Sequence, residues 1–127
     1  MKKAISTEKA PGAIGPYSQA IEAGGMLFVS GQLPIDPKTG AFAGEDIASQ
    51  TKQSLTNIKA ILEQAGYAMN DVVKMTVLLA DIEQFTAMND VYNTFFEAPY
   101  PARAAFAVKT LPKYAGIEIE AIAVKGA

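Results

Sequence analysis

The longest regular pattern of hydrophobic positions lies between residues 46 and 65. Apolar or small residues recur there every three or four positions, at Ile47, Thr51, Leu55, Ile58, Leu62 and Ala65. This spacing predicts an amphipathic helix with one buried face. Asp46 is suited to cap its first turn, and Gly66 stands where a left-handed residue commonly ends a helix.

A second helix is predicted after Asp81, which is a suitable N-cap, with Gln84 placed to return the capping bond. Its hydrophobic stripe consists of Phe85, Met88, Tyr92, Phe95 and Phe96. We expect this aromatic stripe to pack in the core rather than to line a ligand pocket. Pro99 and Pro101 are expected to end the helix, because the residue before a proline is disfavoured in helical geometry.

The remaining apolar runs predict strands. Their ranges are 17–23, 26–30, 71–80, 103–109 and 117–124, and residues 2–6 are a candidate for a further short strand. Gly24 and Gly25 separate the first two runs and suit a hairpin turn, since glycine tolerates positive φ. Alternation along 71–80 gives two faces, namely Val73, Met75, Val77 and Leu79 on one and Lys74, Thr76 and Leu78 on the other.

The predicted order of elements is therefore β-β-α-β-α-β-β. Helices that join strands at this spacing indicate right-handed crossovers, which place both helices on one face of a single sheet. The other face stays uncovered and carries Leu78 and Ile122 or their neighbours. Because an exposed apolar sheet face favours burial against another copy, we expect an α+β fold that forms an oligomer.

Length and charge narrow the class of protein. The chain has 127 residues, half of them hydrophobic, so residues 1–127 are expected to form a single domain. The net charge is −2 and the basic residues do not cluster, which argues against a nucleic-acid partner. No apolar run approaches the roughly 20 residues of a membrane span. Polar residues after Lys3 interrupt any signal-peptide pattern, so we expect a cytoplasmic protein.

Two residue types are missing, since the chain has no cysteine and no histidine. The first absence excludes disulfides, thiolate nucleophiles and cysteine-based metal sites. The second removes the usual general base near neutral pH and excludes serine–histidine triads, cysteine–histidine dyads and ordinary zinc hydrolysis. Any catalysis must therefore use carboxylates, Arg, Lys, Tyr, backbone groups and water.

One arginine lies inside the small, apolar run 99–108. Alternation places Arg103, Ala105 and Ala107 on one face of the predicted strand, with Phe106 and Val108 on the other. The alanine neighbours leave room for a partner, and the guanidinium offers a planar fork that matches a carboxylate. A salt bridge at a strand edge is the alternative, and this run alone leaves both interpretations open.

Two carboxylates, Glu118 and Glu120, alternate with isoleucines and project from one face of the last strand. A solvated strand face is the simplest interpretation of either one alone. In a plain hairpin of the last two strands, Glu118 would face Val108, and Arg103 would lie roughly 16 Å away at ~3.3 Å per residue. If Glu118 and Arg103 act together, either these strands are not a simple hairpin or the site spans two subunits.

Five short motifs, taken together, resemble the RidA (formerly YjgF) family of reactive-intermediate imine deaminases. They are Gly15–Ala20 (G-P-Y-S-Q-A), Ser30–Pro34 (S-G-Q-L-P), Asn89 with Tyr92, Pro101–Ala104 (P-A-R-A) and Ile117–Ala121 (I-E-I-E-A). Each motif is weak by itself. Their order and spacing match the family over essentially the whole chain, which makes the set highly specific.

The resemblance implies a chorismate-mutase-like fold, with a single mixed sheet, two helices on one face, and a homotrimer with three clefts between subunits. It implies hydrolysis of 2-imino acids, such as 2-iminobutanoate and 2-iminopropanoate, to 2-oxo acids and ammonia, without a cofactor. These imines arise from enamines that pyridoxal-phosphate dehydratases release from threonine or serine, so a functional link to such enzymes is implied.

By the family pattern, Arg103 holds the substrate carboxylate and Glu118 positions the attacking water. Further positions that match the cleft are Tyr17, Ser30, Gly31, Asn89 and Ala105. Many members carry a cysteine where this chain has Ala105. The thiol is not thought to be a nucleophile in the family, so the difference bears on pocket shape and substrate preference rather than on the expected activity.

Elementary chemistry agrees with this assignment. A protonated imine is already electrophilic, so water oriented by a carboxylate and by backbone groups near Gly31 suffices, with acid–base help typically contributing ~10²–10⁴-fold. A nearby Arg103 would lower the pKa of Glu118 and burial in a cleft would raise it. The sequence leaves open which effect is larger.

Two other function classes stay open. The protein could be a sensor that binds 2-oxo acids, or a chaperone-like trimer that uses the same clefts, because binding a 2-oxo acid requires Arg103 but not Glu118. An endoribonuclease activity is attributed to some relatives of the family. The absence of histidine, the negative net charge and the lack of a basic stripe leave little to grip phosphate here.

Overall fold

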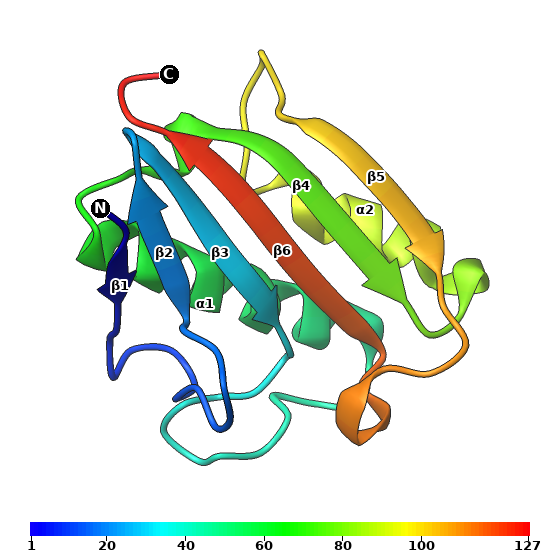
Figure 1. Ribbon diagram of the computed structural model, residues 1–127. Coiled ribbons are helices and arrows are strands. Elements are labelled where there is room, and N and C mark those ends of the chain that lie inside the picture. Colours follow the sequence, from blue (N-terminus) through cyan, green and yellow to red (C-terminus); the bar gives the residue numbers. More distant parts are fainter.

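The computed structural model describes residues 1–127 and shows one sheet backed by two helices (Figure 1). The strands are β1 (Lys3–Ile5), β2 (Ala20–Ala23), β3 (Met26–Gln32), β4 (Val72–Leu79), β5 (Ala102–Ala107) and β6 (Ile117–Val124). The helices are α1 (Ile47–Gln64) and α2 (Phe85–Asn93), with short 3-10 helices η1 (Met69–Asp71), η2 (Ile82–Gln84) and η3 (Pro112–Tyr114). The α+β class, the single sheet and the two helices on one face are confirmed.

The sheet order is β1-β2-β3-β6-β4-β5. β4 and β5 run parallel, and the other neighbours run antiparallel, so the sheet is mixed. The last strand of the chain thus enters the middle of the sheet, between β3 and β4. A plain hairpin of the last two strands is therefore wrong, since β4 lies between β5 and β6.

The strand expected at 17–23 begins only at Ala20. The three preceding residues belong to a loop, because the Gln19 side chain is buried and bonds to other loop residues instead of pointing out of a sheet. The predicted hairpin after β2 is confirmed, with positive φ at Gly24 (58°) and Gly25 (75°). β1 lies within the candidate range 2–6.

One face assignment on β4 is wrong. Val72 packs into the core and Val73 is exposed, although the alternation predicted the reverse. The pairing of β4 with β6 shifts register between Val72 and Lys74, and such a bulge turns the start of the strand by one position. From Met75 onward the predicted alternation is confirmed, since Met75, Val77 and Leu79 are buried.

The start of the second helix also differs from the prediction. Asp81 acts as a cap, but its carboxylate accepts from the Glu83 N–H (3.0 Å) at the start of η2. α2 itself begins at Phe85, and its N-cap Gln84 makes no side-chain capping bond. The short spacing between Asp81 and Glu83 favours a tight 3-10 turn over a full capping box.

The helix ends at Asn93, well before Pro99. The N–H groups of Thr94 and Phe95 bond three residues back, to Val91 and Tyr92, which tightens the last turn and closes the helix. Phe95 and Phe96 therefore pack against the core from the segment after α2. Met88 and Tyr92 are the buried members of the predicted stripe, and the three phenylalanines are half-buried.

α1 matches its prediction closely. The Asp46 carboxylate accepts from the Ser49 N–H (2.9 Å), and Gly66 follows the helix with φ of 81°. The core lies between this helix, α2 and the sheet. Its largest fully buried residues include Leu27, Leu55, Ile58, Ile61, Leu62, Met75, Met88, Ile117 and Ile119. None of the helices is long and apolar enough to cross a membrane.

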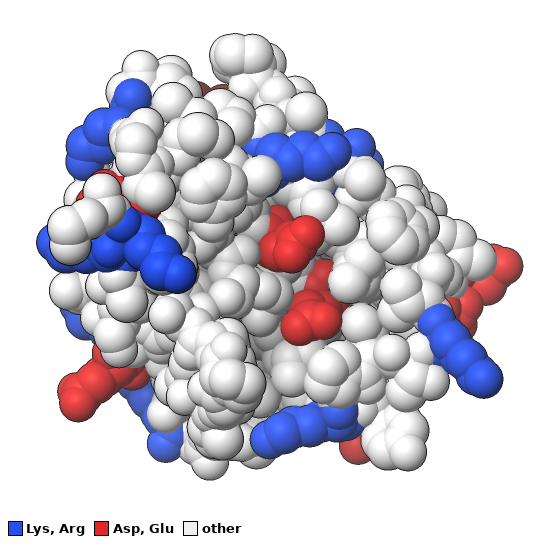
Figure 2. All heavy atoms as spheres, viewed as in Figure 1, with Lys and Arg blue, Asp and Glu red and all other residues white.

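The opposite face of the sheet, here called the open face, carries no helix (Figure 1). Strand pairing places Ile122 beside Phe28 and Leu78 beside Phe106 on it. Figure 2 views this face and shows acidic atoms near its middle, among mostly uncharged atoms. The apolar open face agrees with the expected oligomer, and the homotrimer stays a prediction.

Candidate functional site

The first part of the candidate site forms around an irregularity in β3. The pairing of β3 with β6 shifts register between Val29 and Gln32, which leaves Ser30 and Gly31 as a bulge. The Ser30 hydroxyl donates to the Ser18 carbonyl (2.6 Å), and the Ser30 N–H donates to the Gln19 carbonyl (2.9 Å). These bonds attach the segment that carries Tyr17 to the end of β3.

Gln19 holds the same segment from the interior. Its Oε1 accepts from the Thr7 N–H (2.7 Å), and its Nε2 donates to the carbonyls of Thr7 (3.0 Å) and Pro11 (2.8 Å). A buried amide with these partners is well satisfied and is costly to move. The exposed Tyr17 is therefore presented by a loop with a fixed anchor.

Glu118 lies directly against Gly31. A Cβ at Gly31 would stand 2.6 Å from the Glu118 Oε2 and 2.9 Å from its Cδ, closer than non-bonded atoms approach one another. The missing side chain of Gly31 thus makes the space that the carboxylate occupies. Sequence reasoning expected both residues in one cleft, and the structure brings them into contact range.

Burial raises the pKa of Glu118 above its ordinary value, and the neighbouring Glu120 carboxylate raises it further. Both effects disfavour the charged form of Glu118. Arg103 of the same chain does not offset them, because it lies elsewhere on the sheet. A carboxyl group with a raised pKa accepts and returns protons closer to neutral pH, which suits acid–base chemistry.

A cavity of about 660 Å³ opens over this cluster. Tyr17, Ser30, Gly31 and Glu118 all line it, together with Glu120, Lys113 and the loop that begins at Pro11. Sequence reasoning missed Lys113, whose only signal is its place in the loop before β6. Lys113 (φ 57°) and Tyr114 (φ 58°) both adopt the left-handed conformation that non-glycine residues rarely adopt.

The second part of the candidate site surrounds Arg103 on β5. The Arg103 Nη1 donates to the Asn89 Oδ1 (2.7 Å), and the guanidinium carbon lies 4.7 Å from the ring centre of Tyr92 and 5.5 Å from that of Phe85. Arg103 therefore contacts an amide and two aromatic rings, and not the carboxylate of the strand-edge salt bridge that was its alternative interpretation. Most of the five guanidinium N–H donors stay available to a ligand.

A separate cavity of about 450 Å³ lies beside Arg103. It is lined by Asn89, Tyr92, Asn93, Tyr100, Pro101 and Arg103. The Tyr100 hydroxyl donates to the Asn93 Oδ1 (3.0 Å) on its wall. Sequence reasoning missed this pair, although the four-residue spacing of Asn89 and Asn93 on a predicted helix places both on one face.

Ala105 lies on the same side of β5 as Arg103, two residues further along the strand. It pairs with Val77 and packs against the core, half-buried. A larger side chain at this position would extend from the strand beside Arg103. Ala105 lines neither the cavity beside Arg103 nor the one over Glu118, so within one chain the structure does not bring it into the candidate site.

The two parts of the candidate site do not meet within one chain. Arg103 pairs with Met75, whose side chain is buried on the helix side, whereas Glu118 pairs with Leu78 on the open face. Leu78 also pairs with Phe106, so Glu118 lies level with Phe106 and two strands away from it. Three residues along the strand and two strand spacings separate the Glu118 and Arg103 backbones by about 14 Å.

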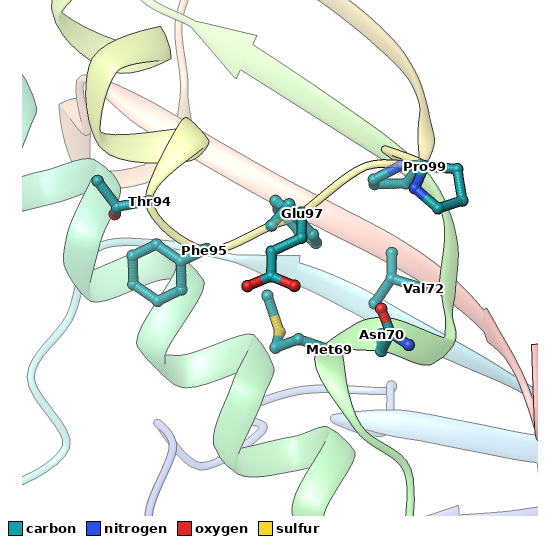
Figure 3. A pocket seen from close by; sticks show the side chains of 9 residues that line it. Met69, Asn70, Val72, Thr94, Phe95, Glu97 and Pro99 are labelled. Carbon is teal, nitrogen blue, oxygen red and sulfur yellow. The ribbon is translucent and has the colours of Figure 1, made fainter.

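Another cavity, of about 340 Å³, lies between η1 and the segment that follows α2 (Figure 3). Figure 3 shows the Glu97 side chain pointing toward Met69, with the Phe95 ring at one end and Pro99 at the other. None of the residues that the sequence singled out for chemistry lines this cavity. It therefore carries no part of the candidate site.

Residues 7–125 match the family model described as Endoribonuclease L-PSP. The chain belongs to this family, which is the RidA (YjgF) family. The family resemblance of the five sequence motifs is thereby confirmed.

Relatives with closely similar sequences carry two kinds of name. A RutC family protein of Pyrococcus horikoshii is 59% identical over 125 residues, which cover 98% of this chain and 99% of that protein. A 2-iminobutanoate/2-iminopropanoate deaminase of Bos taurus is 52% identical and covers 99% of this chain and 92% of that protein. The deaminase of the same name from Salmonella typhimurium is also 52% identical, with coverage of 98% and 99%.

Solved structures of the family share the fold over nearly the whole chain. The structure of E. coli TdcF with bound serine has a TM-score of 0.93 and 46% identity, and covers 98% of this chain and 99% of that one. RidA from the Antarctic bacterium Psychrobacter sp. has a TM-score of 0.92 and 46% identity, with coverage of 96% and 98%. The sheet and helices described above are therefore those of the RidA family.

Proposed function

We propose that this protein hydrolyses small 2-imino acids, such as 2-iminobutanoate and 2-iminopropanoate, to 2-oxo acids and ammonia. One observation carries the proposal. The chain presents a cation with free donors, Arg103, and a carboxyl group with a raised pKa, Glu118, each beside its own cavity. Relatives that are 52% identical and named for this activity support it.

The complete site forms where two copies meet, in a homotrimer with one cleft at each subunit contact. Arg103 stands on β5, an edge strand, and is exposed, so a second copy can approach it. Glu118 stands on the open face, which needs a partner to cover its apolar residues. Packing the open face of one copy against the β5 edge of the next joins the two parts.

In this site Arg103 binds the substrate carboxylate through two charge-assisted hydrogen bonds, with Asn89 holding its other end. Glu118 accepts a proton from a water molecule as the water oxygen attacks the carbon of the protonated C=N group. Glu118 then gives this proton to the nitrogen of the tetrahedral product and takes the proton of the new hydroxyl group as the C–N bond breaks with its electrons on nitrogen. The 2-oxo acid leaves, and ammonia takes the proton from Glu118 and departs as ammonium. Tyr17 and the backbone at Ser30 and Gly31 enclose the reacting atoms.

The proposed substrate places the protein downstream of pyridoxal-phosphate dehydratases, which release the corresponding enamines from threonine and serine. A small ligand with a carboxylate also agrees with the bound serine in the structure of E. coli TdcF. The chemistry uses residues of this chain and water, without a cofactor.

The direct test couples the purified protein to a threonine dehydratase that generates 2-iminobutanoate in the assay. Formation of 2-oxobutanoate and ammonia should be faster than spontaneous hydrolysis and should rise with protein concentration. The variant Arg103→Ala, once circular dichroism has shown that it is folded, should give only the rate of spontaneous hydrolysis. An unchanged rate at every concentration of the wild-type protein would refute the proposal.

A binding role without turnover is the second candidate, because the cavity beside Arg103 is complete without Glu118. A sensor of 2-oxo acids would bind 2-oxobutanoate equally well as wild type and as Glu118→Gln, with no hydrolysis by either. Hydrolysis that Glu118→Gln abolishes, with binding retained, separates the deaminase from the sensor.

A further inference from the structure

We propose that the rings of Tyr92 and Phe85 are positioning groups that hold the Arg103 guanidinium ready for a carboxylate, with Tyr92 as the principal one. The inference rests on the proposed function, in which Arg103 binds the substrate. It gives a role in the site to two residues of the predicted core stripe, one of which, Tyr92, also belongs to a family motif.

The geometry comes from one face of α2. Phe85, Asn89 and Tyr92 are spaced four and three residues apart, so their side chains project from the helix together. The guanidinium carbon lies 4.7 Å from the Tyr92 ring centre and 5.5 Å from the Phe85 ring centre, within the range of cation–π contacts. The Asn89 Oδ1 accepts one N–H from the same group.

Tyr92 is itself firmly held. It is only 4% exposed, and its ring packs against Phe96 with ring centres 4.8 Å apart. Its hydroxyl is buried without a hydrogen-bond partner, so the ring rather than the hydroxyl is what it offers to Arg103. Burial raises the pKa of Tyr92, while Arg103 acts in the opposite direction, and the phenol stays protonated at neutral pH.

An exposed arginine normally samples many rotamers, and a ligand must immobilise it on binding. Here the rings restrict the guanidinium before any ligand arrives, and Asn89 occupies one of its donors. The remaining N–H edge is left for the carboxylate. Such preorganisation increases affinity by reducing the entropy lost on binding.

The first measurement follows Arg103 directly, in the full-length protein without ligand. Arg103 is the only arginine of the chain, so its Nε–Hε signal stands alone in ¹⁵N spectra, and this signal should be that of an ordered side chain shifted by the ring currents. Tyr92→Leu should make it mobile and remove the shift, and Tyr92→Phe should restore both. Equal mobility of Arg103 in wild type and Tyr92→Leu would overturn the inference.

The second measurement separates the ring's charge distribution from its shape. Phenylalanine with one, two or three fluorine atoms at position 92 keeps the ring but progressively weakens its attraction for a cation. The dissociation constant of 2-oxobutanoate, measured by calorimetry, should rise stepwise to roughly tenfold, which corresponds to about 1.4 kcal/mol. A series with no trend would show that Tyr92 acts by packing alone.

Tyr67 is a matched control for the fluorine series. It is also 4% exposed, and its own cation, the Lys125 Nζ, lies 4.7 Å from its ring centre. It does not line the cavity beside Arg103. The same fluorinated residues at position 67 should leave the 2-oxobutanoate affinity unchanged, and an equal loss at both positions would overturn the inference.

The outcomes for the inference and for the proposed function are distinct. If the wild-type protein neither hydrolyses 2-iminobutanoate nor binds 2-oxobutanoate, the proposed function fails, and the Arg103 signals still decide whether the rings hold the guanidinium. If binding depends on Arg103 but not on the ring at position 92, only the positioning role fails. Should Tyr92→Leu not fold, Tyr92→Phe and the fluorine series keep the ring and decide the question.

Discussion

Glu118 and Arg103 lie on opposite faces of one β-sheet, with strand β4 between their two strands. A small substrate cannot touch both residues of a single chain at this separation. The proposed chemistry therefore requires Arg103 from one copy and Glu118 from another, so activity depends on assembly of the oligomer.

Mixing two inactive variants tests this arrangement. Arg103→Ala and Glu118→Gln should each lose activity alone, yet regain part of it when unfolded together and refolded as mixed oligomers. If every site takes Arg103 from one copy and Glu118 from another, random mixing restores about a quarter of the sites. The double variant refolded with itself is the control. No recovery by the mixture would place both residues of each site in one chain.

The fall in activity at low pH, the acid limb of the pH profile, should be caused by protonation of Glu118. Activity should fall as the pH is lowered through the pKa of Glu118, because protonation removes the base. Glu118→Gln should lose ~10²–10⁴-fold in kcat together with this limb, while retaining 2-oxobutanoate binding. A full acid limb in Glu118→Gln would assign it to another group.

Glu120→Gln is the companion measurement. The Glu120 charge contributes to the raised pKa of Glu118, so its removal should move the acid limb to lower pH and cost little of the maximal rate. Arg103 of a second copy lowers the pKa of Glu118 in the assembled cleft. Because this arginine is present in both the wild type and Glu120→Gln, it does not change the direction in which the acid limb moves. A limb that moves upward would contradict the assignment.

Ionisation of Glu118 as the pH rises should increase activity but decrease the stability of the fold. The pKa of Glu118 is higher in the folded chain than in the unfolded chain, so the folded state is favoured by protonation and loses stability as the pH rises through the folded pKa. In an Arg103→Ala background, which removes the cation of the second copy from the cleft, Glu118→Gln should therefore raise the free energy of unfolding at pH 7.5, with a smaller gain at pH 4. Urea unfolding at matched protein concentration measures both values, and a larger gain at pH 4 would contradict the burial effect.

Gly31→Ala should impair activity without unfolding the protein. The new Cβ would collide with the Glu118 carboxyl, which is the mobile end of its side chain and can move aside. A displacement near 1 Å at a reacting group can cost ~10²-fold in rate. Gly12→Ala is a matched control, since it lines the same cavity and a Cβ there meets nothing within 4 Å. Equal activity of the two variants would refute the role of Gly31.

A charge on the open face should disrupt the predicted trimer. Phe106 is 48% exposed in the single chain and lies on that face, so Phe106→Asp would place a carboxylate in the proposed subunit contact. Light scattering should show a trimer for the wild type and smaller species for the variant. Ile82→Asp is the control, because Ile82 is 49% exposed but lies in η2, outside the sheet. A stable wild-type monomer at micromolar concentration would refute the assembly.

The local sequence pattern was sufficient to predict those elements whose structure depends on short-range contacts. The stripe from Ile47 to Ala65 predicted α1 with its cap and its terminal glycine, because helical spacing and capping depend on residues within a few positions. The bounds of β6 agree with the predicted range 117–124 for the same reason. Prediction failed where a longer-range pairing intervened, as at Val73, whose face is set by a bulge against β6.

The site shows the same division. The sequence by itself narrowed the available chemistry, because the absence of histidine and cysteine left carboxylates, Arg, Lys, Tyr, backbone groups and water, and the resemblance to the RidA family singled out Arg103 and Glu118 among them. The sequence left open whether Arg103 and Glu118 of one site belong to the same subunit or to two subunits. Only the tertiary structure decided that β6 enters the sheet beside β3 and β4, since the pairing of strands distant in sequence depends on the packing of the whole core. That insertion puts Glu118 against Gly31 on the open face and leaves Arg103 on an outer strand, held by α2, on the other side.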